Sequence, residues 1–339
     1  MYRTTLFQML RSKRVALFLR ILIILAAYGF IAWKLNQVSA RWQETGMEGF
    51  VPNPFMVALV VGLMPVNWLL EAVRWKMLTG KIQSLSLWRS LLSVLAGIAM
   101  GILTPRRIGD VGGRCLMMNP GTRRKGLLAF ALGSMLQTAV TSFFGLLALA
   151  ALMKGPHGLP RDQHLLLLAG AITALSLLAL WSFNLKAFAR LLLRIPPVKK
   201  FRDTLTYFHE MKPTRTLKVF LLGMGRYVLF ASQFFLLTRA FGSSLPMMQA
   251  YTGIALTYFL MTFVPLSSLA GLGIRGSTAV FVFGLFTSQT GGILLATLTL
   301  WMINLALPAL PGVWITGQAT QWQWKIAPAP APSKSYKSL

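Results

Sequence analysis

The chain has 339 residues, a formal net charge of +27 and a mean hydropathy of +0.62. Only 12% of its residues are charged, against about 25% in a typical soluble domain. This composition excludes an ordinary water-soluble enzyme, and it excludes a typical nucleic-acid-binding protein because that class is basic and hydrophilic. A strongly apolar and basic chain is typical of an all-α polytopic integral membrane protein.

Six apolar runs are long enough to cross a bilayer, whose hydrocarbon layer of about 30 Å needs about 20 helical residues. They cover about 15–33, 55–73, 126–152, 165–183, 218–239 and 290–316. The runs are continuous and lack the alternation of a membrane β-barrel, so each predicts a transmembrane helix. The first run is too long for the apolar core of a signal peptide.

Two further apolar stretches, 85–120 and 247–288, are interrupted at 104–110, at 264–266 and at 271–276. Proline and glycine predict that these breaks are non-helical. Non-helical backbone at membrane depth must be buried in protein or line a wet cavity, so both stretches are interpreted as re-entrant helical hairpins. The alternative is a set of ordinary helices with surface loops, which gives ten spans.

The distribution of lysine and arginine predicts the orientation of the spans. The connections rich in cations are 74–89, 114–125 and 184–218, whereas 153–164 has few. The positive-inside rule then places both termini in the cytoplasm. Within 184–195, Lys186, Arg190 and Arg194 recur every four residues. This spacing indicates either an interfacial helix that binds anionic lipids of the cytoplasmic leaflet or a solvated extension of the fourth span.

The predicted layout contains an inverted repeat within a single transmembrane domain, residues 1–318. Its halves cover about 55–152, with the hairpin 85–120, and about 218–316, with the hairpin 247–288. Paired interrupted segments in two inverted halves indicate a transporter binding site. Residues 319–339 are predicted to form a disordered cytoplasmic tail, because the stretch 327–339 is rich in proline and alanine.

No motif in the sequence predicts a cofactor or a metal site. A phosphate-binding loop is missing, and the three histidines have no ligand spacing with cysteine or acidic residues. A nucleophile and base in catalytic arrangement are missing as well, so the sequence disfavours an enzyme acting on lipid headgroups. The single cysteine, Cys115, excludes an intramolecular disulfide.

Two acidic residues, Glu71 and Asp110, lie at predicted membrane depth, where charged groups are costly and usually paired or functional. Glu71 precedes Arg74 by three residues, so one interpretation is a structural salt bridge along a helix. Asp110 follows Arg106 and Arg107. This group predicts either a local ion pair at the hairpin tip or part of a polar substrate cavity.

Arg275 is the main candidate for binding a substrate. It lies between glycines in the second break, and no acidic residue follows position 210. Its partner must come from elsewhere in the fold or from a ligand, and a phosphate or carboxylate fits. Half-helices that start at the breaks, beside Thr104, Gly271 and Gly273, would offer backbone donors to the same anion. Arg226 is a weaker candidate, because its side chain can extend to the cytoplasmic surface.

Both breaks resemble one protein family. The sequence TPRRIGD at 104–110 resembles the T-P-G-R-x-G-E segment of the lysylphosphatidylglycerol synthase transmembrane family. Residues 265–281 resemble the family's P-x-x-x-G-G-[LI]-G-[VI]-R-E-G-A hairpin, and the resemblance extends from the first helix to about residue 316. The chain departs from this pattern at Arg106, Asp110 and Gly276, and the last replaces a glutamate beside Arg275.

The resemblance implies a lipid translocator in a bacterial cytoplasmic (inner) membrane, because the family includes the flippase portion of bacterial multiple-peptide-resistance lipid proteins. The expected substrate is an anionic or zwitterionic phospholipid or lipid-linked headgroup. Phosphate would bind Arg275, Arg106 and Arg107, while Asp110 and Glu71 would orient these cations or exchange a proton. The short tail implies that synthase activity is absent. The alternative is a non-transporting scaffold or accessory subunit for a lipid-modifying enzyme.

Overall fold

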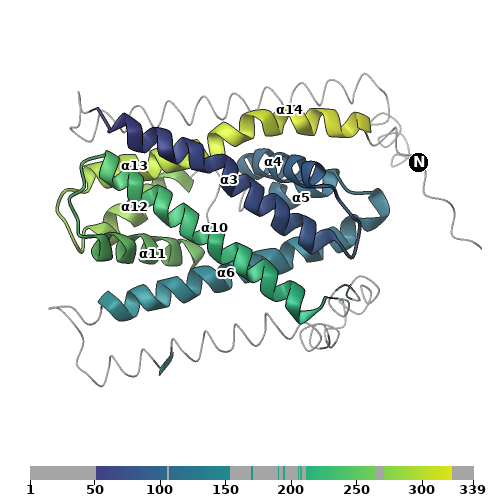
Figure 1. Ribbon diagram of the computed structural model, residues 1–339, viewed down its shortest axis with the longest axis horizontal. Helices are drawn as coiled ribbons and strands as arrows, with labels where there is room; N and C mark the ends of the chain where they lie inside the picture. The colour runs from purple at the N-terminus through teal and green to yellow at the C-terminus, as the bar shows by residue number, and fades with distance from the viewer. Residues whose placement is uncertain are drawn as a thin grey trace, which may run out of the picture.

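A computed structural model of the chain describes residues 51–104, 107–152, 211–263 and 271–322, with six isolated residues between 169 and 207. The predicted span at about 15–33, most of the span at about 165–183 and of the segment 184–195, the predicted break at 264–266, Arg106 and the tail beyond residue 322 lie outside the described residues. Within the described ranges the secondary structure is helical, as the composition predicts (Figure 1).

The first half of the bundle is a long helix, a pair of shorter helices and a second long helix. These are α3 (Pro54–Thr79), α4 (Leu87–Leu103), α5 (Ile108–Leu116) and α6 (Arg123–Leu152), the last preceded by the short helix η2 (Pro120–Thr122). Asn53 begins α3 by accepting hydrogen bonds from the backbone N–H groups of Phe55 and Met56. Such a side-chain cap satisfies donors that the first helical turn leaves free.

The second half repeats this order. It consists of α10 (Pro213–Ala240), α11 (Met247–Phe263), α12 (Gly271–Phe283), α13 (Gly291–Trp301), the π-helical turn η4 (Met302–Ala306) and α14 (Leu307–Trp322). In the part of the chain that the structure describes, four helical segments are long and apolar enough to cross a membrane: Pro54–Thr79, Pro120–Leu152, Pro213–Ala240 and Gly291–Gln318. They confirm four of the predicted runs as helices of spanning length.

The first long helices of the two halves, α3 and α10, run in opposite directions. The backbone N–H of Asn53, before α3, donates to Ala240 O at the end of α10, at 3.1 Å. At the other end of the pair, Gly80 follows α3 and lies beside Arg215 in the first turn of α10. Helices α3 and α10 are therefore antiparallel along their length (Figure 1).

Three sequence-based boundaries are wrong. The first break ends at Arg107, because α5 begins at Ile108. Residues 271–276 belong to α12, although their glycines predicted a break. Each glycine destabilises a helix by only about 1 kcal/mol, and packing offsets this cost. Because Gly276 has no side chain, Leu294 of α13 can pack directly against its backbone. Helix α14 also continues to Trp322, beyond the expected start of the tail at residue 319.

Glycine packing holds α4 and α5 together in the first hairpin. A Cβ atom on Gly109 would collide with the backbone carbonyl of Met100, and one on Gly113 would collide with that of Ala96. The chain reverses at Arg107, whose φ of 57° is left-handed, an uncommon conformation for a residue with a side chain. The hairpin therefore depends on very close backbone approach at one face of α5.

Substituting alanine for Gly113 should therefore destabilise the protein. The added methyl group meets a backbone carbonyl that cannot rotate away, and overpacking of this kind typically costs about 1–3 kcal/mol. Gly112→Ala is the matched control, because its new atom would meet only Met100 Cε at 3.7 Å. Both changes raise helix propensity equally, so thermal unfolding of the two variants in detergent isolates the contact. Equal melting temperatures would contradict the packing described for Gly113.

Candidate functional site: an arginine-rich cavity

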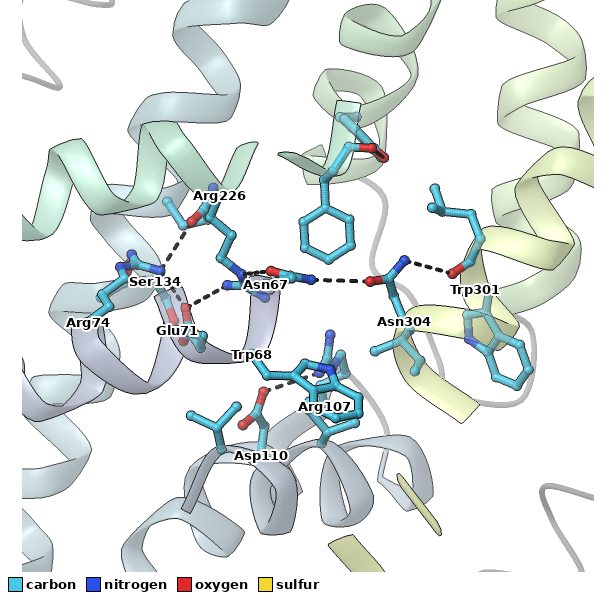
Figure 2. A pocket seen from close by; sticks show the side chains of 18 of the residues that line it. Asn67, Trp68, Glu71, Arg74, Arg107, Asp110, Ser134, Arg226, Trp301 and Asn304 are labelled. Atoms are coloured by element: carbon cyan, nitrogen blue, oxygen red, sulfur yellow. Dashed lines mark hydrogen bonds and ion pairs between the residues drawn. The ribbon is translucent and has the colours of Figure 1, made fainter. Parts of the chain in front are cut away.

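A cavity of about 230 Å³ lies at the centre of the bundle, where the two halves meet. Its lining comes from long helices and from both helical pairs, and Figure 2 shows many of its polar side chains pointing toward one another. Among the described residues, the charged side chains of the lining are five arginines and two carboxylates: Arg74, Arg107, Arg114, Arg226, Arg275, Glu71 and Asp110. Their formal charges leave the cavity with an excess of three positive charges.

Glu71 of α3 is the centre of the ion-pair network. Its Oε1 accepts from Arg114 Nη1 at 2.6 Å, and its Oε2 accepts from Arg226 Nη1 at 2.7 Å and from Arg74 Nη1 at 3.3 Å. The Glu71 side chain is only 8% exposed. A buried carboxylate is stable only when such partners replace its lost hydration. Glu71 thus joins α5 and α10 to α3.

Asp110 extends this network to the tip of the first hairpin. Its Oδ1 accepts from Arg114 Nε at 2.7 Å, and its Oδ2 accepts from Arg107 Nη2 at 3.3 Å. Arg114 therefore lies between the two carboxylates and also contacts the rings of Trp75 and Phe130. These contacts fix the guanidinium, since flat cationic groups pack favourably over aromatic faces.

Neutral amides continue the network into the second half (Figure 2). Arg226 Nε donates to Asn67 Oδ1 at 2.8 Å, and Asn67 Nδ2 donates to Asn304 Oδ1 at 3.2 Å. Asn304 lies in the π-helical turn η4 and donates in turn to Leu300 O at 3.3 Å. A continuous polar path therefore runs from α10 through α3 to η4. π-Helical turns within α-helices often occur at functional sites.

Arg107 and Arg275 carry the positive charge that the network leaves least neutralised. Arg107 contacts Asp110 through one nitrogen, and its side chain is 40% exposed. Arg275 lines the cavity from α12, and the ion pairs among the described residues do not include it. The two cations come from different helical pairs and line the same cavity.

The structure brings four of the predicted site residues together: Glu71, Asp110, Arg107 and Arg275 all line the cavity. The predicted Glu71–Arg74 pair is confirmed, although it is only one of three contacts of that carboxylate.

Three other predicted site residues lie at the ends of helices. Thr104 Oγ1 donates to Met100 O and accepts from Gly109 N, so it caps the hairpin. Gly271 and Gly273 begin α12, four and two residues before Arg275. They are absent from the described cavity lining, and Arg106 falls outside the described residues.

From the sequence, two arginines of the site were assigned to connections between spans. Arg74 and Arg114 were counted with cytoplasmic connections, but their side chains are 3% and 7% exposed and belong to α3 and α5. Arg226, the weaker candidate for binding a substrate, lines the cavity and pairs with Glu71. The spacing of Asp110 and Arg114, four residues apart, was a signal for a helical ion pair.

A helical bundle with four helices of spanning length and a polar, arginine-rich interior is a multi-pass membrane protein. Residues 17–320 match the family model of the lysylphosphatidylglycerol synthase TM region. The chain belongs to this family, as its two hairpin motifs predicted. A comparison with curated proteins finds no match at a significant level. The match covers a transmembrane region, which is compatible with a lipid-related membrane function and consistent with a non-catalytic domain.

Proposed function

We propose that the protein moves an anionic or zwitterionic phospholipid, or a lipid-linked headgroup, between the two leaflets. The observation that carries this proposal is the central cavity with five arginines and two carboxylates. Phosphate is the group that arginine binds best, through paired N–H donors. Arg275 and Arg107 would bind it, together with Arg106 of the same hairpin tip. A volume of about 230 Å³ suits a headgroup whose acyl chains stay in the bilayer.

The short helices support a re-entrant placement of both hairpins. Helix α5 has 9 residues and α12 has 13, which correspond to about 14 Å and 20 Å at about 1.5 Å per residue. Neither length crosses a hydrocarbon layer of about 30 Å, which disfavours the ten-span alternative. Arg107 before α5 and Arg275 in α12 line the same central cavity, as expected if both tips reach the middle of the membrane.

The hairpins open toward opposite ends of the bundle. Gln83, just after α3, accepts from Asn119 N at 2.9 Å and closes the base of the first hairpin. The base of the second hairpin lies at the other end of α3, where Gly292 lies against Phe241. This arrangement supports alternating access, in which one repeat rocks against the other around a central site.

Rocking of the halves would act on the contacts that join them. The Glu71–Arg226 ion pair and the Asn67–Asn304 hydrogen bond both connect the first half to the second. All four carboxylate oxygens of Glu71 and Asp110 face arginine nitrogens. This supports a role in orienting the guanidinium groups over a role in exchanging protons.

A reconstitution experiment tests translocation and separates it from the accessory-subunit alternative. Purified protein is placed in liposomes that carry a fluorescent phosphatidylglycerol, and quenching of the outer leaflet reports exchange between leaflets. We expect exchange to be faster than in protein-free liposomes without any partner protein. An unchanged rate would contradict translocation and favour a scaffold that acts with a lipid-modifying enzyme.

The proposed location is the cytoplasmic membrane of a bacterium, with both termini in the cytoplasm. This orientation rests on the cation-rich connections and on the positive-inside rule. In it, the end of α3 and the start of α10 face the cytoplasm.

A further inference from the structure

A second hollow, of about 320 Å³, lies where α3 ends and α10 begins, away from the central cavity. Its described lining is Met77, Lys81, Lys212, Thr214, Arg215 and Lys218. Four of these six residues are cations and none is acidic. The two cavities share no described lining residue. The positive charge here is therefore a separate feature from the arginine network.

The cations converge from two helices on one level of the bundle. Lys81 follows the last residue of α3 by two positions, and Lys212 is the N-cap of α10. Both helices are of spanning length, so this level corresponds to the membrane surface. The start of α10 adds the positive end of the helix dipole.

Arg215 has a hydrogen-bond donor in this hollow that lacks an acceptor. Its Nη1 atom is buried and lacks a hydrogen-bond partner among the described residues, although it lies close to Gly80 at the end of α3. A buried guanidinium nitrogen without an acceptor is costly. An anion bound between the four cations would supply the missing acceptor oxygen.

We propose that this hollow binds the phosphate group of an anionic phospholipid from the leaflet at this end of the bundle. The neighbouring surface of α10 carries exposed Leu217 and Leu221, which would contact the acyl chains. A phospholipid places its phosphate at the bilayer surface and its chains along the helix below. The cationic hollow would therefore hold the phosphate, and the apolar face of α10 would contact the chains. This site is a bound-lipid site and does not depend on translocation.

Two double variants with the same charge change test the proposal. Lys212→Gln/Lys218→Gln removes two exposed lysines of the hollow and leaves Arg215 in place. Arg124→Gln/Lys125→Gln removes two cations from the first turn of α6 and serves as the control. Native mass spectrometry of the full chain in detergent measures the affinity for short-chain phosphatidylglycerol. We expect about thirtyfold weaker binding in the first variant and a change within about twofold in the control, since each of the two lysines near the anionic lipid contributes about 1 kcal/mol.

Two further measurements separate the possible sources of the phosphate group. Inorganic phosphate should compete only at much higher concentration than short-chain phosphatidylglycerol, because it lacks the contacts of acyl chains. Arg275→Gln should keep this bound lipid, which distinguishes the hollow from the central cavity. Equal losses in the two double variants, no loss in either, or equally effective competition by inorganic phosphate would overturn the lipid site.

Discussion

Replacing Arg275 by glutamine is expected to slow lipid transfer by about 10- to 100-fold while the protein still folds. Arg275 lines the central cavity, and the ion pairs of the described residues do not include it, so its loss leaves no buried carboxylate unpaired. A hydrogen bond to a charged group contributes about 1.5–3 kcal/mol, and about 1.4 kcal/mol corresponds to a factor of ten. The rate of fluorescent phosphatidylglycerol exchange in liposomes measures the effect.

Arg89→Gln is the matched control for this experiment. It removes the same charge from an exposed position in the first turn of α4, outside the described lining of the cavity. We expect its exchange rate and its melting temperature to equal those of the wild type. If Arg275→Gln transferred lipid at the wild-type rate, the assignment of Arg275 to the phosphate group would be wrong.

Replacing Glu71 by glutamine is expected to destabilise the whole bundle. The substitution keeps the size of the side chain but removes the negative charge that faces Arg74, Arg114 and Arg226. Breaking a buried ion pair from one side typically costs about 3–5 kcal/mol, because the remaining charge is buried without compensation. Thermal unfolding of the purified protein in detergent should show a clearly lower melting temperature.

A double-mutant cycle separates this effect from a general loss of packing. In Glu71→Gln/Arg226→Gln, one of the uncompensated cations is removed together with the carboxylate. We expect the double variant to be more stable than the sum of the two single effects, since the two groups are in contact at 2.7 Å. Strict additivity, or a Glu71→Gln protein as stable as the wild type, would show that the network does not hold the halves together.

The spanning helices could be predicted because continuous apolar runs have few other structures in a membrane. The runs at 55–73, 126–152, 218–239 and 290–316 all became helices of sufficient length. The ends of the helices could not be predicted in the same way, because a glycine raises the free energy of a helix only slightly and so does not by itself end it. Packing against α13 therefore decided that residues 271–276 are helical.

The members of the ion-pair network could be predicted only where they are close in sequence. Glu71 with Arg74 and Arg107 with Asp110 lie on the same helical turn or hairpin tip. The contact of Glu71 with Arg226 joins positions 155 residues apart, and no local pattern reports it.

Arg74 and Arg114 show how counting cations can mislead. Each lies near the end of an apolar run, where the positive-inside rule assigns it to a connection. Whether such a residue reaches water depends on the helix packed against it. Here α5 lies close enough to α3 for Arg114 to reach Glu71.

The central claim is that the arginine-rich cavity receives a lipid headgroup, and an experimental map of the protein in a phosphatidylglycerol-containing nanodisc tests it most directly. We expect density for a phosphate group within hydrogen-bonding distance of Arg275, about 3 Å, with the acyl chains leading into the bilayer. A map in which lipid density surrounds the bundle, while the cavity at Arg275 contains only water, would contradict the claim.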